Sequence, residues 1–144
     1  MAVSRSIELY PLGYYSLMNT LTTHVSAPFD DVVAATRRAL AEQGFGVLTE
    51  IDVTATMKSR LDRDIEQFVI LGACNPDLAF QALSAQRAIG TLLPCNVVVR
   101  QVDGDVLVEA VDPLMMLGVV DDDAVRSVAT DAAERLSNAL ASLA

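Results

Sequence analysis

Hydrophobic and polar positions follow two periods along the chain, one typical of strands and one typical of helices. Five segments alternate with a period of two or form short apolar runs, which predicts half-buried or internal strands. These predicted strands are residues 18–25, 45–53, 67–73, 92–101 and 105–111. Three segments that start near Pro28, Asn75 and Asp121 carry apolar residues at helical spacing and predict helices.

The local signals at the element ends agree with these periods. Asn75 is a good N-cap and Pro76 suits the first helical position, since its missing N–H would have no partner there. Asp103 and Gly104 tolerate the positive φ angles of a tight hairpin turn. The connector 54–64 is weakly patterned, and we expect at most a short helix capped by Thr54.

The alternation also predicts which side of each strand is buried. In the first strand Leu21, Thr23 and Val25 share one side and His24 faces the wetter side. In the second strand the odd-numbered positions from 45 to 53 are predicted to face inward, and the even-numbered positions, Leu48 among them, to face outward.

The order strand, helix, strand, connector, strand, helix, strand, strand, helix predicts an α+β fold. The helices are expected to cover one face of a mostly antiparallel sheet. The other face is then either solvated or covered by another subunit. Because four apolar residues fall on the nominally wetter sides, we favour cover by a second copy of the chain. These residues are Leu48, Val98, Leu107 and Val111.

Length and composition limit the class of protein. The chain has 144 residues, of which 52% are apolar and 20% charged, as expected for one globular domain. Residues 1–17 carry three tyrosines and are expected to form an arm, with a single domain over 18–144. No segment has the length of a membrane span or the form of a secretory signal, so we expect a cytoplasmic protein.

The charge balance argues against two classes of partner. Ten Lys and Arg residues face nineteen Asp and Glu residues, a formal net charge of −9. Binding to nucleic acid or to an acidic membrane draws on clustered cations, and this chain has no basic arm. We therefore expect neither partner.

The two cysteines carry the most suggestive chemistry. Cys74 and Cys95 are each followed by an asparagine, Asn75 and Asn96. Cys74 directly precedes a predicted helix, where the backbone dipole can lower the pKa of a thiol. If the strands that end at Ala73 and begin near Cys95 are antiparallel, both thiols reach the same edge of the sheet and face one pocket.

Less specific interpretations of these residues stay open. Both cysteines can be small buried hydrophobes, a shared thiol site, or part of a ligand set. A structural zinc site lacks a ligand, since His24 is the only histidine, and we expect no metal. Lys58, the only lysine, is a candidate contact for an anionic group, or else part of a solvated face. Met115 and Met116 are either soft ligands beside the thiols or packing residues.

Several phrases of the sequence resemble the bacterial and archaeal domain of unknown function family DUF302. They are Ala27-Pro28-Phe29, the run Gly44 to Asp52, Ile70 to Pro76, Leu92 to Val97, and Asp112-Pro113. The resemblance implies an α+β fold of the TATA-binding-protein-like class, commonly a dimer. It implies no reaction and no cofactor, and the fold name does not by itself indicate DNA binding.

Together these features lead to one functional expectation and two alternatives. We expect a small dimeric ligand-binding or sensing domain, with Cys74, Asn75, Cys95, Asn96 and Lys58 at its pocket and an unknown small-molecule ligand. One alternative is a thiol-dependent enzyme in which Cys74 is the nucleophile and Cys95 resolves it. The other is a structural or interaction protein that uses its sheet face.

Overall fold

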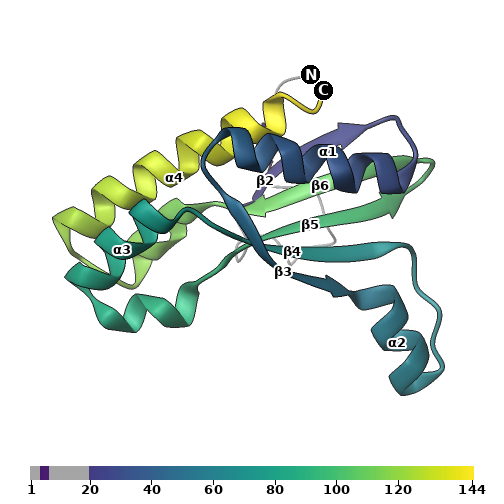
Figure 1. The fold of residues 1–144 in the computed structure, drawn as a ribbon, viewed down its shortest axis with the longest axis horizontal. Coiled ribbons are helices and arrows are strands. Elements are labelled where there is room, and N and C mark those ends of the chain that lie inside the picture. Colours follow the sequence, from purple (N-terminus) through teal and green to yellow (C-terminus); the bar gives the residue numbers. More distant parts are fainter. Residues whose placement is uncertain (1–3, 7–19) are drawn as a thin grey trace.

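The computed structural model describes residues 4–6 and 20–144, which form one antiparallel sheet with helices on one face (Figure 1). The six strands lie side by side in the order β1-β2-β6-β5-β4-β3. The strands are β1 (Ser4–Ser6), β2 (Thr20–Val25), β3 (Gly46–Asp52), β4 (Phe68–Cys74), β5 (Cys95–Val102) and β6 (Asp105–Val111). The helices are α1 (Phe29–Glu42), α2 (Val53–Leu61), α3 (Pro76–Ala85) and α4 (Asp123–Ala141), with 3-10 helices η1 (Arg87–Leu92) and η2 (Pro113–Gly118).

The predicted α+β class and the predicted order of elements are confirmed. Ser4–Ser6, within the expected arm, pair with β2 as an edge strand. The other arm residues, including all three tyrosines, and the first two residues of the first predicted strand lie outside the described residues.

Helices α1 and α4 bury one face of the sheet. The apolar stripe of α4 is buried along its length and packs with α1 against the inward side chains of β2, β6, β5 and β4. Asp122 begins α4 by accepting hydrogen bonds from the backbone N–H groups of Ala124 and Val125. Burial of this stripe, rather than helix propensity, supplies most of the stability of such a helix.

The hairpin between β5 and β6 forms as predicted. Asp103 and Gly104 both have positive φ angles, 47° and 88°. This turn brings β6 back beside β5, and β6 also pairs with β2, so that Val25 lies opposite Val106. The C-terminal hairpin therefore occupies the centre of the sheet.

The inward and outward positions predicted for β3 are wrong in its second half. A β-bulge lies between Val47 and Thr49, and an extra residue on one strand reverses the alternation beyond it. Val47 therefore faces the core, whereas Ile51 lies opposite Ile70 and is 49% exposed. Leu48, at the bulge, is 68% exposed.

Two further element boundaries differ from the prediction. The connector contains α2, but its N-cap is Asp52, which accepts from the backbone N–H of Ala55, and not Thr54. The hydroxyl of Thr54 instead donates to the carbonyl of Glu66 and accepts from the N–H of Phe68. Residues 92–94 precede the strand, because η1 extends through Leu92 and β5 begins at Cys95.

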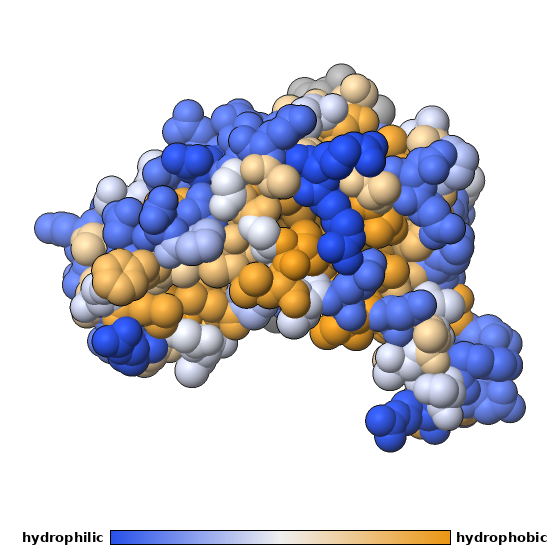
Figure 2. Space-filling model, in the orientation of Figure 1, coloured by the Kyte–Doolittle hydropathy of each residue, from blue (hydrophilic) through white to orange (hydrophobic). Residues whose placement is uncertain are grey.

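The face of the sheet away from the helices is only partly apolar. Of the four apolar residues predicted on wetter sides, Leu107 is fully buried within the single chain, Val98 and Val111 are half-buried, and Leu48 is exposed. Figure 2 views the molecule from the side opposite to that face, with α1 in front of the sheet, and there apolar surface gathers near β3, between the α3 end of the molecule and the projecting α2. None of the helices in the described part of the chain has the length and hydrophobicity to cross a membrane.

Candidate functional site

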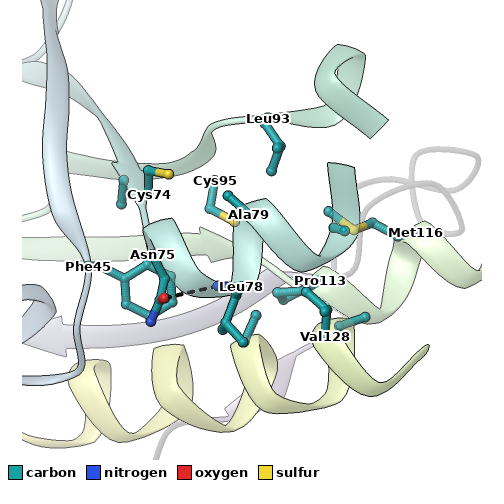
Figure 3. Close-up of a pocket in the computed structure, with 14 residues that line it drawn as sticks. Phe45, Cys74, Asn75, Leu78, Ala79, Leu93, Cys95, Pro113, Met116 and Val128 are labelled. Atoms are coloured by element: carbon teal, nitrogen blue, oxygen red, sulfur yellow. Dashed lines mark hydrogen bonds between the residues drawn. The ribbon is translucent and has the colours of Figure 1, made fainter. Parts of the chain in front are cut away.

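The register of β4 and β5 brings the two cysteines together. The strands are antiparallel, and Ala73 lies directly opposite Cys95. Cys74, the last residue of β4, is one position beyond that pair. Both thiols are free, and both line one cavity between the sheet end and helices α3 and α4 (Figure 3). The antiparallel arrangement on which the predicted pocket depends is therefore present.

The cavity is small and almost wholly apolar. Its volume is about 30 Å³, room for about two water molecules. Its lining residues are Phe45, Ala73, Cys74, Asn75, Leu78, Ala79, Ala82, Leu93, Cys95, Pro113, Met116, Val128, Ala129 and Ala132. A metabolite of ordinary size needs a pocket at least about ten times larger, so only an occupant of very few atoms fits inside.

The two thiols differ in their surroundings. Cys95 is 7% exposed, and Cys74 is half-buried. Burial raises the pKa of the Cys95 thiol to about 11, and the nearby Cys74 adds to the rise. Because successive side chains of a strand point to opposite faces, Cys74 and Cys95 approach the cavity from different sides of the sheet end.

The two asparagines that follow the cysteines have separate places. Asn75 is the N-cap of α3, and its Oδ1 accepts from the backbone N–H of Leu78 at 3.2 Å. This hydrogen bond fixes the start of α3 against the cavity. Asn96 lies opposite Gly72 and is exposed on the face of the sheet away from the helices. Asn75 thus lines the cavity, and Asn96 does not.

Two glycines allow the chain to pack closely around this end of the sheet. A Cβ atom on Gly72 would lie 2.2 Å from Oγ1 of Thr49 and 3.0 Å from Cγ of Pro94. A Cβ atom on Gly44 would lie 3.0 Å from Nδ2 of Asn75, and its φ of +83° also favours glycine. Close approach of β3, β4 and the segment before β5 therefore holds the cysteines in position.

Most residues in the walls of the cavity are ones for which the sequence predicts burial but no part in a site. Leu78 and Ala82 of α3 and Val128 and Ala132 of α4 belong to a second hydrophobic cluster, separate from the main core under α1. Their helical spacing predicted burial, but not that they meet opposite the cysteines. The thioether of Met116 on η2 joins them across the cavity.

Lys58 lies in a different part of the molecule. It is on α2, beside the Phe68 end of β4, while Cys74 ends that strand. Six residues of strand separate the two ends by about 20 Å. The Nζ atom of Lys58 contacts Oδ1 of Asp62 at 3.0 Å and Oδ1 of Asp64 at 3.3 Å. The structure therefore does not bring Lys58 to the cysteines.

The groove beside Lys58 is large and acidic. Its volume is about 610 Å³, and its walls come from α1, α2 and the ends of β3 and β4. Four carboxylates line it, those of Asp30, Glu50, Asp52 and Asp64, against the single ammonium group of Lys58. Because negative groups outnumber the one positive group, the groove does not favour binding of an anionic ligand at Lys58.

Metal ligands of the usual kinds do not gather in the part of the chain that the structure describes. His24 is exposed, lies opposite Leu107 on the face away from the helices, and is not part of the cavity. Within residues 4–6 and 20–144, no three His, Cys, Asp or Glu side chains form a group that could hold a metal ion. Zinc therefore finds no site of the usual composition there.

Comparisons with known proteins support the family rather than an activity. The family model "Domain of unknown function DUF302" matches residues 21–143. A crystal structure of an uncharacterized conserved DUF302 protein from Bacillus stearothermophilus has a TM-score of 0.82 and 30% sequence identity, over 89% of this chain and 100% of that chain. No curated protein matches. Since both the sequence model and the solved fold cover nearly the whole domain, the chain belongs to the DUF302 family.

Proposed function

We propose that this protein is a small ligand-binding or sensing domain whose ligand enters the apolar cavity at Cys74 and Cys95. The observation that carries the proposal is that two free thiols, distant in sequence, line one cavity of about 30 Å³. The ligand is accordingly an atom or a molecule of few atoms that sulfur recognises. Asn75 contributes by fixing the start of α3. Asn96 is exposed on the other face of the sheet and Lys58 lies at the other end of β4, so neither takes part.

The experiment that tests this function is intact mass spectrometry of the full chain as purified, first under native and then under denaturing conditions. We expect a small adduct that is retained only under native conditions. It should be absent from Cys74→Ala and Cys95→Ala. Masses that agree between the two conditions, or an adduct that both variants retain, would contradict the proposal.

A thiol-dependent enzyme is the second candidate, favoured by the position of Cys74. This thiol is half-buried and lies one residue before the N-cap of α3. The buried partner argues the other way, because a thiol with a pKa of about 11 supplies little thiolate at neutral pH for a resolving attack.

Thiol labelling separates the two candidates. For a nucleophilic enzyme, iodoacetamide at pH 7 should alkylate Cys74 much faster than a free cysteine in a peptide. For a ligand site, we expect Cys74 to react no faster than that peptide, and Cys95 to react far more slowly because it is buried. Peptide mapping by mass spectrometry measures the two rates in one sample.

We further propose that two copies associate through the face away from the helices. The register places Ile51, Ile70 and Val98 in one row across β3, β4 and β5 on that face. Ile51 is half-exposed, and the exposed Leu48 precedes it on β3. An apolar row of this kind at an open sheet edge supports a homodimer rather than a purely solvated surface.

Sedimentation velocity of the full chain tests this association. We expect a dimer for the parent protein and a monomer for Ile51→Lys. The exchange Leu61→Lys on α2, which likewise replaces an exposed aliphatic residue by lysine, is the matched control and should leave the dimer intact. A parent protein that sediments as a monomer at micromolar concentration would exclude the dimer and favour a solvated face.

A further inference from the structure

The groove between α1 and α2 has the size of a small-molecule site and an apolar floor. Its volume of about 610 Å³ lies within the range of about 300–1,000 Å³ in which proteins bind small ligands. Phe29 and Val33 lie one turn apart on α1, and Phe68 and Val69 begin β4; all four are buried or half-buried. In Figure 1 the start of α1, the end of β3 and α2 lie at the right of the view. The floor can therefore take the hydrocarbon part of a ligand.

The β-bulge in β3 places two carboxylates on the side of the sheet where this groove lies. Regular alternation would put Ile51 on the helix side of the sheet, and Glu50 and Asp52 on the other side. Beyond the bulge, Glu50 lies opposite Leu71 and Asp52 opposite Val69, and both of these partners belong to the core under the helices. Ile51 is left 49% exposed. Bulges often redirect side chains beside functional sites, and this one exchanges the burial of an isoleucine for acidic groups at the groove.

Two of the four carboxylates on the rim of the groove already have cationic partners. Arg37 contacts Oε2 of Glu50 at 2.9 Å, and Lys58 contacts Oδ1 of Asp64 at 3.3 Å. The four side chains are all at least 40% exposed, so water screens their charges. Each pair is close to neutral and adds little to the net charge of the groove.

The other two carboxylates, Asp30 and Asp52, form no ion pair within the described residues. Oδ1 of Asp52 accepts from the neutral backbone N–H of Ala55, and Asp30 is exposed in the first turn of α1. The dipoles of the helices that begin at these residues offset each charge only in part, by about half a unit. No three acidic side chains of residues 4–6 and 20–144 converge in a way that could hold a metal ion. Separate negative charges on α1 and β3 instead suit a ligand with separate positive charges.

We infer that the groove binds a linear aliphatic polyamine, with its ammonium groups at Asp30 and Asp52 and its methylene chain on the floor formed by Phe29 and Phe68. Long cationic chains bury their methylene groups on apolar surface and keep the charged ends in water, which matches an apolar floor with an acidic rim. Lys58 competes with the ligand as a cation on the same rim. Because the rim is exposed, we expect weak binding that salt reduces. This site is separate from the proposed function, since the cysteines lie at the other end of β4.

A titration of the full chain with 1,5-diaminopentane, followed by ¹H–¹⁵N nuclear magnetic resonance spectra, tests the inference. We expect saturable shifts at the backbone amides of the groove, those of Ala55 and Phe68 among them, at millimolar ligand. Pentylamine has the same chain with one ammonium group, and should bind about fivefold more weakly or worse. Mg²⁺ has the same charge without a chain, and should not shift these amides in a saturable way at the same concentration.

Charge-removing variants locate the contacts. Asp30→Asn and Asp52→Asn should each weaken binding of the diamine by about three- to fivefold, and asparagine at position 52 can still cap α2. Lys58→Ala should strengthen binding by a similar factor, because it removes the competing cation. Asp62→Asn is the matched control: Asp62 contacts the same ammonium group at 3.0 Å as Asp64 does, but it does not line the groove. We expect this variant to bind within about twofold of the parent protein.

Four results would overturn the inference: no saturable shift with the diamine, equal affinity for pentylamine, the same saturable shifts with Mg²⁺, or equal losses in Asp30→Asn and Asp62→Asn. The last two would show that the amine responds only to the general negative charge of the protein. Far-ultraviolet circular dichroism confirms that each variant is folded. Cys74→Ala should bind the diamine like the parent protein, so the result is independent of whether the cysteine cavity holds a ligand.

Discussion

The two ends of β4 carry hollows of opposite character. At the Cys74 end, a cavity of about 30 Å³ is closed by α3, α4 and η2 and lined by hydrocarbon and sulfur. At the Phe68 end, a groove of about 610 Å³ lies between α1 and α2 and is lined by four carboxylates and one ammonium group. In Figure 1 the two regions lie at opposite ends of the strands, with α3 at the left of the view and α2 projecting at the lower right.

This contrast shows that volume alone is a poor guide to a site. The charged groups of the large groove are mostly well exposed, as in the ion pair of Lys58 with Asp64, whose side chains are 55% and 86% exposed. Water screens such groups, and ion pairs of this kind contribute little free energy. The small cavity instead removes nucleophilic sulfur from water, and that arrangement requires the whole fold to be in place.

The largest expected effect is a difference in stability between the two ends. Leu78→Ala enlarges the cavity at a residue that is 7% exposed, and should lower the free energy of unfolding by about 3 kcal/mol. Leu61→Ala on α2, where the leucine is 63% exposed, should lower it by less than about 0.5 kcal/mol. Urea denaturation followed by circular dichroism measures both. Equal losses would contradict the contrast.

A second prediction concerns alkaline pH at the cysteine end. The pKa of Cys95 is about 11 in the folded protein, against 9.0 for a cysteine thiol in water. Between these two values the unfolded chain loses the Cys95 proton first, so stability present below pH 9 is lost as the pH rises toward 11. The loss should reach roughly 2.5 kcal/mol above pH 11, relative to Cys95→Ala.

Cys74→Ala is the control for this pH dependence. Burial is the larger cause of the raised pKa of Cys95, so most of the alkaline loss should remain when Cys74 is absent. Urea denaturation at pH 8, 9, 10 and 11 gives the free energies. A parent protein that loses no more stability with pH than Cys95→Ala would show that the Cys95 thiol is accessible to water.

A third prediction tests the close packing beside the cavity. Gly72→Ala places a Cβ atom against Oγ1 of Thr49 and Cγ of Pro94, and should cost about 1–2 kcal/mol. The double variant Gly72→Ala with Thr49→Ala should recover a large part of that loss, because the shorter side chain removes the closer of the two contacts. Thermal unfolding of the two single variants and the double variant measures the coupling.

The smallest expected effect is at Lys58. Lys58→Ala should change the free energy of unfolding by less than about 0.5 kcal/mol, since its ion pairs are exposed. It should also leave the rate at which iodoacetamide alkylates Cys74 unchanged, because the two ends of β4 are far apart. A clear change in that rate would show that the two regions are coupled.

The sequence predicted most of the fold because its local signals agree with one another. The Asp103-Gly104 turn, the Asn75 cap and the stripe of α4 each specify an element without help from the rest of the chain. The faces predicted for the second half of β3 are wrong because the bulge after Val47 depends on how β3 pairs with β4. The sequence of one strand does not reveal that pairing. The cap of α2 at Asp52 was missed for a similar reason, since tertiary hydrogen bonds occupy Thr54.

The candidate site was predictable only in part. That Cys74 and Cys95 share a pocket follows from antiparallel pairing, which the order of elements indicated. The place of Lys58 did not follow, because nothing in the connector fixes the direction in which α2 projects. The contribution of Met116 and of the α3 and α4 walls depends on how η2 packs across the sheet end, which is a tertiary property.

The central position of β6 has a consequence for biosynthesis. Thr20 pairs with Val111, so β2, which pairs on its other side only with the three-residue β1, finds its inner main-chain partner after most of the polypeptide has left the ribosome. Until then β2 and the apolar side of α1 have no sheet to cover them, and contacts so distant along the chain form slowly. We expect nascent chains that stop before Asp105 to be protease-sensitive and to require a chaperone, and complete chains to become resistant in a single step.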